Sequence, residues 1–229
     1  MRVVSVLMCL TLLAVFLGCR TRTYERGDVA ARSLQQAAME VQVQSRYLTF
    51  TMSALDDLVN RPAADLRPQF ELFRRNLDRL QDSAGRNEKA ARAAYERNAA
   101  YLGSWDRQIT NMNYEVVRSR SEARRTEVTN KFNAVNQRYA EARTVMQPLL
   151  TYLTDIRRAL GSDLTMGGIE SVRPVVANAA DNAKKVEIAL SKLTNELADS
   201  GARMSSIGVQ TPASGSTNVA QSQKASGRQ

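Results

Sequence analysis

The stretch that decides the fold is "VTNKFNAVNQRYAEARTVMQPLLTYLTDIRRAL", residues 128–160. Apolar side chains recur in it at intervals that alternate between four and three residues: Val128, Phe132, Val135, Tyr139, Ala142, Met146, Leu149, Leu153, Ile156 and Leu160. This spacing places them along one side of a helix and is the pattern of left-handed coiled-coil packing. The stretch therefore predicts one long helix whose apolar stripe packs against other helices.

Three other segments carry the same pattern. Residues 31–59 and 169–207 are apolar at nearly every seam position, for example Leu34, Leu55, Leu190 and Leu197. Residues 70–112 differ because small and polar residues occupy many of their seam positions. The complete set of seam positions in this segment is Phe70, Phe73, Leu77, Leu80, Ala84, Asn87, Ala91, Ala94, Asn98, Tyr101, Trp105, Gln108 and Met112. Polar residues at Ser45, Asn87, Asn98 and Gln108 favour a role in fixing helix register, with a ligand site as the alternative.

Breaks between the segments indicate four antiparallel helices. "NRPAADLRP" (60–68) and "GSDLTMGG" (161–168) interrupt the pattern, and Gly161 fits the position just past a helix end. Between the second and third segments the seam slips by one residue, which a continuous coiled coil does not absorb. We therefore expect a hairpin near residues 110–117, with an unbroken helix over 66–160 as the alternative. The predicted fold is an elongated all-α bundle with helices at about 28–60, 66–112, 116–161 and 166–207.

The N-terminal residues read as an export signal. Arg2 is followed by an uncharged, mostly apolar run over residues 3–17, too short to span a bilayer comfortably. The run ends in "FLGC" (16–19), which resembles the lipobox of bacterial lipoproteins. That resemblance implies cleavage after Gly18 and acylation of Cys19, and Arg20 then points to the outer membrane. The alternative is a plain secretory leader or a short uncleaved anchor.

These signals divide the chain into a signal peptide (1–18), a lipidated linker (19–27), a helical domain (28–207) and a disordered tail (208–229). The tail "GVQTPASGSTNVAQSQKASGRQ" has no usable apolar pattern.

Composition argues against most enzyme classes. The 229-residue chain contains no histidine and only two cysteines, Cys9 in the leader and Cys19 at its end. The usual general base, the His/Cys metal sites and the nucleophile–histidine systems therefore cannot form. Phosphate-binding glycine motifs do not occur either. We predict a non-enzymatic protein without a cofactor or metal; an enzyme would need buried carboxylates facing each other in a cleft.

The whole pattern resembles a bacterial lipoprotein family known only as a domain of unknown function. A lipobox leader is followed by a helical segment that contains Trp105. Asn113 comes next, and then a run of arginines and serines over residues 118–121. The stretch "MQPLLTYLTDIRRALGSDLTMGGIESV" (146–172) resembles the connection between that family's third and fourth helices. The similarity spans most of residues 19–205 and implies a lipoprotein with a helical coil, but no active site.

Helix lengths suggest which end of the bundle faces the membrane. The first helix is shorter than the second, so the hairpin near residue 114 is expected to extend about 20 Å beyond its start on the membrane side. This hairpin carries Arg118, Arg120, Arg124 and Arg125. We hypothesise that these arginines contact anionic lipid, lipopolysaccharide or cell wall; the alternative is a solvated helix end.

The sequence leaves two functions open. The first is a lipid-anchored, periplasm-facing scaffold or interaction module whose partners are the membrane and other envelope components. A homo-oligomer is compatible with its thin, Ala-rich cores. Nucleic acid is not expected as a partner of an exported protein, despite a net charge of +9. The second is a module that shelters an apolar or lipidic ligand between helices. A cavity near Ala84, Ala91 and Ala94 would favour this second function, and a close-packed core would exclude it.

Overall fold

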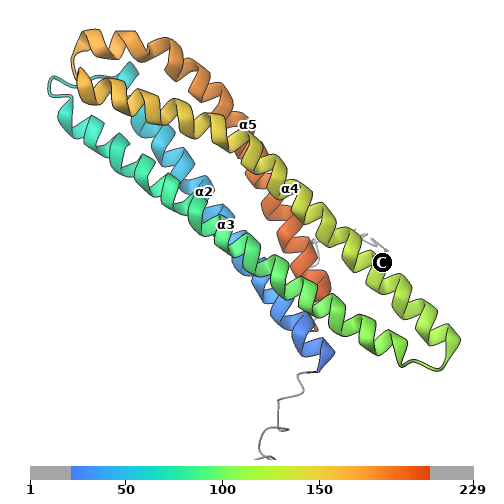
Figure 1. The fold of residues 1–229 in the computed structure, drawn as a ribbon. Coiled ribbons are helices and arrows are strands. Elements are labelled where there is room, and N and C mark those ends of the chain that lie inside the picture. The colour runs from blue at the N-terminus through green and yellow to red at the C-terminus, as the bar shows by residue number, and fades with distance from the viewer. Residues whose placement is uncertain (1–21, 207–229) are drawn as a thin grey trace, which may run out of the picture.

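The computed structural model describes residues 22–206, which form four helices and no strand. The helices are α2 (Thr23–Asn60), α3 (Arg67–Thr110), α4 (Glu115–Ser162) and α5 (Met166–Met204). They run alternately in opposite directions along one long axis (Figure 1). The prediction of an elongated all-α antiparallel bundle is confirmed. The predicted leader, Gly18, Cys19 and the tail over 208–229 lie outside the described residues.

Each helix packs against two neighbours. Helix α2 contacts α3 and α5, and α4 contacts the same two helices, whereas the diagonal pairs make no close backbone contact. This is the arrangement of an up-down-up-down four-helix bundle. The start of α2, the end of α5 and the α3–α4 hairpin all lie at one end (Figure 1), which we call the hairpin end; the opposite end is the loop end.

The heptad stripes of α4 and α5 pack as predicted. In α4 every seam residue from Val128 to Leu160 is buried except Tyr139, which is half-buried. In α5 the whole stripe from Ile169 to Ser200 is buried. One apolar core joins all four helices because their stripes converge on the bundle axis.

Helix α3 departs from its predicted seam. Ala84 and Ala91 are only half-buried, and Gln108 is exposed while its neighbour Ile109 is buried. The shift at Gln108 has a geometric cause. Helix α2 begins at the level of Ser104, so the last turn of α3 packs only on α4 and buries the side that faces it.

Helix α2 begins at Thr23, inside the predicted 19–27 linker. The backbone N–H of Arg22 donates to Glu25 Oε2 (2.8 Å), and the hydroxyls of Thr23 and Ser104 lie 3.0 Å apart. Gly27 lies inside this helix and suits its position, because a Cβ there would approach the ring of Tyr101 to 3.1 Å. The early start shortens the overhang, since the six residues of α3 beyond Ser104 add about 9 Å rather than the predicted 20 Å before the turn.

The hairpin prediction is confirmed, and one capping prediction is wrong. Helix α3 ends at Thr110 and α4 begins at Glu115. At the other connection α4 continues through Gly161 to Ser162, and no glycine of the described chain has a positive φ. The glycine that this turn requires is Gly168, where a Cβ would lie 2.1 Å from the carbonyl oxygen of Asp163.

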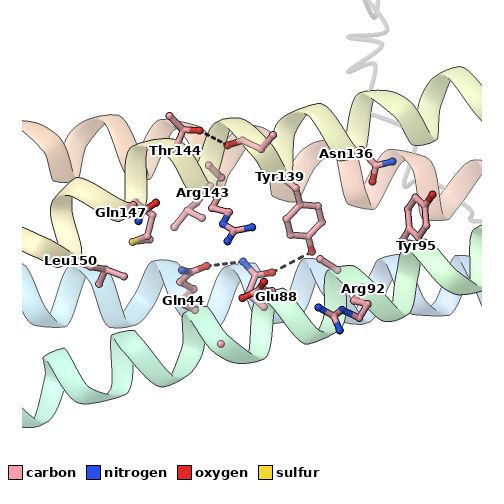
Figure 2. Close-up of a pocket in the computed structure, with 18 residues that line it drawn as sticks. Gln44, Glu88, Arg92, Tyr95, Asn136, Tyr139, Arg143, Thr144, Gln147 and Leu150 are labelled. Atoms are coloured by element: carbon pink, nitrogen blue, oxygen red, sulfur yellow. Dashed lines mark hydrogen bonds between the residues drawn. The ribbon is translucent and has the colours of Figure 1, made fainter.

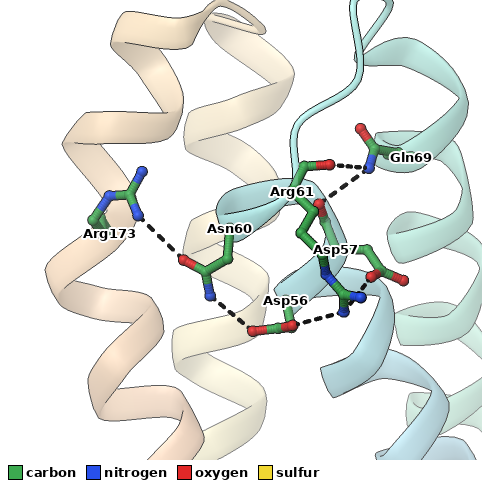
Figure 3. A network of polar contacts seen from close by, with 6 residues as sticks. All are labelled: Asp56, Asp57, Asn60, Arg61, Gln69 and Arg173. Carbon is green, nitrogen blue, oxygen red and sulfur yellow. Dashed lines mark hydrogen bonds and ion pairs between the residues drawn. The ribbon is translucent and has the colours of Figure 1, made fainter.

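Polar side chains close the loop end where α2 stops (Figure 3): Asp56, Asp57, Asn60, Arg61, Gln69 and Arg173. Gln69 Nε2 donates to the carbonyl oxygens of Asp57 and Arg61, each at 3.0 Å. Arg173 of α5 donates to Asn60 Oδ1 (3.1 Å) and so links α5 to the end of α2. The two bonds from Gln69 satisfy backbone carbonyl groups that a helix end leaves unpaired.

Candidate functional site

A groove of about 690 Å³ lies between α3 and α4. Ala84, Gly85, Ala91 and Tyr95 line its α3 side. On the α4 side its walls include Asn136, Tyr139, Ala140, Arg143, Gln147 and Leu150, while Gln44 of α2 and Leu190 of α5 lie deeper. Its volume falls within the range typical of sites for small molecules.

The groove exists because the facing helices carry small side chains there. Of the four neighbouring pairs, α3 and α4 have the sparsest backbone contact. Ala84 and Ala91 occupy seam positions of α3, and a Cβ added to Gly85 would meet no atom within 4 Å. On either side of this region α3 and α4 are joined again, by Arg157 to Asp78 (2.7 Å) and by Trp105 to Ser121 (2.8 Å).

A hydrogen-bonded polar layer forms part of the groove floor. The Tyr139 hydroxyl donates to Asn87 Oδ1 (3.2 Å), and Asn87 Nδ2 donates to Gln44 Oε1 (2.7 Å), so α4, α3 and α2 are linked in a row (Figure 2). Burial raises the pKa of the Tyr139 phenol well above its ordinary value. Tyr139 therefore stays neutral and remains a hydrogen-bond donor at physiological pH.

Charged side chains stand at the rim. Arg143 and Tyr139 extend from α4 toward α3, while Glu88 and Arg92 lie on the α3 side (Figure 2). Within the described residues neither Arg92 nor Arg143 forms an ion pair. Two guanidinium groups against one carboxylate make the rim net positive. An anionic group on a ligand would find unpaired hydrogen-bond donors there.

The groove lies in the region around Ala84 and Ala91, where the sequence analysis expects a cavity if the protein binds a ligand. Ala84 and Ala91 line it, whereas Ala94 is buried and lies outside the lining. The polar residues at Asn87 and Tyr139 were assigned to the seam, and the structure places both at the groove. Sequence reasoning missed Arg92 and Arg143, because a charged residue outside the seam looks like any solvated helix surface.

The four hairpin arginines are in different settings. Arg118 pairs with Glu115 one turn away, and Arg120 is exposed with no ion-pair partner among the described residues. Arg124 pairs with Glu127 (2.6 Å) and donates to the carbonyl oxygen of Arg203 (2.9 Å) at the end of α5. The contact between the Arg124 guanidinium and the Glu127 carboxylate lowers the pKa of Glu127.

Arg125 bridges instead to α3, where it pairs with Asp106 at 2.5 Å. Arg118 and Arg120 therefore lie toward the turn, while Arg124 and Arg125 join α4 to the neighbouring helices.

Two other features are absent from the described residues. No cluster of three or more acidic, histidine or cysteine side chains there could hold a metal ion. No helix in that part of the chain has the length and apolarity needed to cross a bilayer.

Residues 21–205 match the model of the family described as "Protein of unknown function (DUF2959)". The chain belongs to this family. The match covers all four helices, so the DUF2959 domain of this chain is the bundle described above. No curated protein and no solved structure matches the chain.

Proposed function

We propose that this DUF2959 protein is a non-enzymatic, lipid-anchored module of the bacterial envelope that binds a single-chain anionic amphiphile between α3 and α4. The observation that supports this proposal is the groove of about 690 Å³ at Ala84 and Ala91, where a closely packed seam was the alternative. A molecule with one apolar chain and one acidic head group suits both its small-residue wall and its positive rim.

The dimensions of the groove suit an extended chain. The α3 residues that line it run from Ala84 to Tyr95, which corresponds to about 16 Å of helix. Met146 and Leu150 line it together with Ala84, and Arg143 and Arg92 flank the Asn87–Tyr139 layer on its two sides (Figure 2). We place the apolar chain along the first group and the acidic head at the polar layer, between the two arginines. Burial of each methylene group would contribute about 0.8 kcal/mol.

Acylation of Cys19 is the proposed means of attachment, with the bundle facing the periplasm from the outer membrane. Multiple acyl chains on one residue give stable membrane attachment. The hairpin end, where α2 begins, would then face the bilayer. A ligand in the groove would be held at the middle of the bundle, away from the membrane surface.

Titration of the leaderless Cys19→Ala chain with a fluorescent long-chain fatty acid tests the groove. We expect saturable binding to the wild-type bundle. The double variant Ala84→Leu/Ala91→Leu fills the groove and is expected to abolish binding, whereas Arg143→Gln weakens it by removing a cation from the rim. Circular dichroism checks that each variant remains helical.

A matched control is Ala180→Leu, which enlarges an alanine in the separate groove between α2 and α5. Binding that survives Ala84→Leu/Ala91→Leu, or that falls equally in Ala180→Leu, contradicts the proposed site. If the wild-type bundle binds no amphiphile, the scaffold function, with protein partners docking on the helices, replaces the ligand-binding one.

The tether has its own experiment. Radiolabelled palmitate supplied to cells is expected to label the wild-type protein and to leave Cys19→Ala unlabelled. Cell fractionation then places the labelled protein in the outer membrane. Equal labelling of both proteins, or recovery of the wild type in the soluble periplasmic fraction, contradicts the proposed anchor.

A further inference from the structure

We infer that the α3–α4 turn is a second membrane contact: Tyr114, Val116 and Val117 insert into the interfacial region of the bilayer that carries the Cys19 anchor. This inference rests on the proposed lipid tether. The proposed occupant of the surface is the lipid bilayer itself, rather than a protein or the cell wall.

The first support is exposed apolar surface concentrated at the turn. The relative exposures of Tyr114, Val116 and Val117 are 70%, 51% and 52%. Other large exposed apolar side chains of the described chain, such as Met39, Phe50 and Ile188, are spread along the bundle. Scattered apolar residues are ordinary on a surface, but a cluster at one protruding tip indicates an interaction site.

The second support is the length of chain between the anchor and the fold. Thr23 begins α2 at the level of Ser104, and it lies only four residues after Cys19 in the chain. Fully extended, that chain reaches about 13 Å. In α4, Ser121 bonds to Trp105 next to this level, and Tyr114 lies seven residues earlier, about 10 Å further out along the axis.

These two lengths nearly match, and they constrain the turn. If the bundle stands upright, a fully extended linker brings Tyr114 to within about 3 Å of the level of Cys19. A linker that spans less than about 10 Å places the turn beyond the level of Cys19, in the bilayer. The short tether therefore joins the apolar tip to the membrane.

The third support is the chemistry around the apolar residues. Arg120 lies one helical turn from Val116 and has no ion-pair partner in the described chain, so its guanidinium can reach lipid phosphates. Tyr24 is also exposed, at the start of α2 on the same end of the bundle. Tyrosines with nearby cations are typical of the membrane interface.

The test places an environment-sensitive fluorophore at the tip of the acylated protein. Cleavage of the leader removes Cys9 and acylation blocks Cys19, so Val117→Cys supplies a single free thiol for an NBD label. Ala64→Cys, exposed in the loop at the opposite end, is the matched control. Both proteins are reconstituted into vesicles of phosphatidylethanolamine and phosphatidylglycerol, with or without bromine-labelled acyl chains.

We expect brominated lipid to quench most of the fluorescence at position 117 and none at position 64. Val116→Asp in the Val117→Cys protein is expected to abolish this quenching without affecting flotation. Vesicle flotation with unquenched label at 117 overturns the tip inference and leaves the tether intact. A blue-shifted but unquenched label overturns it in favour of a protein contact, and failure to float overturns the tether and the inference together.

Discussion

The Gln44–Asn87–Tyr139 layer separates two unequal halves of the bundle. Toward the loop end α3 contributes Phe73, Leu77 and Leu80 to the core, and each is fully buried. Toward the hairpin end its buried residues change to Ala94, Asn98 and Ser104, with Ile109 in the overhang. The other helices keep apolar stripes through both halves, so the difference arises mainly in α3.

The two halves of the bundle therefore differ in their roles. The loop-end half carries the large side chains and a network of hydrogen bonds, and so it holds most of the packing that stabilises the fold. The hairpin-end half has small and polar side chains on α3, and the groove lies where the two compositions meet. Both proposed contacts, with an amphiphile and with the bilayer, use surfaces that this weaker packing leaves open.

The largest expected effect comes from truncating one leucine in each half. Leu153 and Leu197 are both fully buried, so their leucine-to-alanine variants compare the halves at equal burial. We expect Leu153→Ala to lower the free energy of unfolding by roughly 3–5 kcal/mol and Leu197→Ala by about 2–3 kcal/mol. The smaller loss reflects a looser environment that can collapse around the deletion. Urea denaturation measures both, and equal losses would contradict the difference in packing.

The second prediction concerns Asn98, whose side chain is fully buried in the hairpin-end half. Neither its Oδ1 nor its Nδ2 has a hydrogen-bond partner among the described residues. An unpaired buried amide costs about 1–3 kcal/mol, so Asn98→Leu is expected to raise the free energy of unfolding by a comparable amount. If Asn98→Leu instead destabilises the fold, the amide has a partner that the polypeptide itself does not supply. Thermal denaturation with and without added amphiphile separates these outcomes.

The smallest effect is expected at the polar network of the loop end. Hydrogen bonds from Asn60 and then Arg61 lower the pKa of Asp56 below its ordinary value of 3.8. A lowered pKa in the folded state stabilises the fold above the unfolded-state pKa, and this contribution disappears as the pH falls through the folded-state pKa. Because the side chains are largely exposed, Asp56→Asn should cost only about 0.5 kcal/mol near neutral pH.

The pH dependence provides the check on Asp56. The difference between wild type and Asp56→Asn should shrink toward zero as the solution is acidified below the ordinary carboxyl range. A difference that is constant across this range would show that the charge of Asp56 contributes nothing.

The sequence predicts the packing of a helix best where its seam carries large apolar side chains. The stripe of α4 was predicted almost residue by residue, because a large apolar side chain exposed to water is costly and only one register buries all of them. In α3 the same method placed Ala84, Ala91 and Gln108 in a seam that the structure does not close there. Burying an alanine contributes too little to decide a register, so the neighbouring helices decide it instead.

The candidate site was predictable only in part. Small residues at Ala84 and Ala91 indicated where packing could fail, but a local pattern does not show whether the facing helix approaches. Likewise, the apolar residues Val116 and Val117 looked like ordinary helix positions next to a basic run. Their exposure depends on where α2 and α5 end relative to the turn.

The sequence by itself determined the helices, their approximate ends and their antiparallel order, because hydrophobic periodicity and helix breakers act over a few turns of one chain. It also contains the lipobox-like residues 16–19, and acylation of Cys19 stays a prediction. Only the tertiary structure decided that α2 starts at the level of Ser104, that α3 and α4 separate around the polar layer, and that Tyr114 protrudes. These features depend on how far one helix extends past another, and that distance is set by the packing of all four.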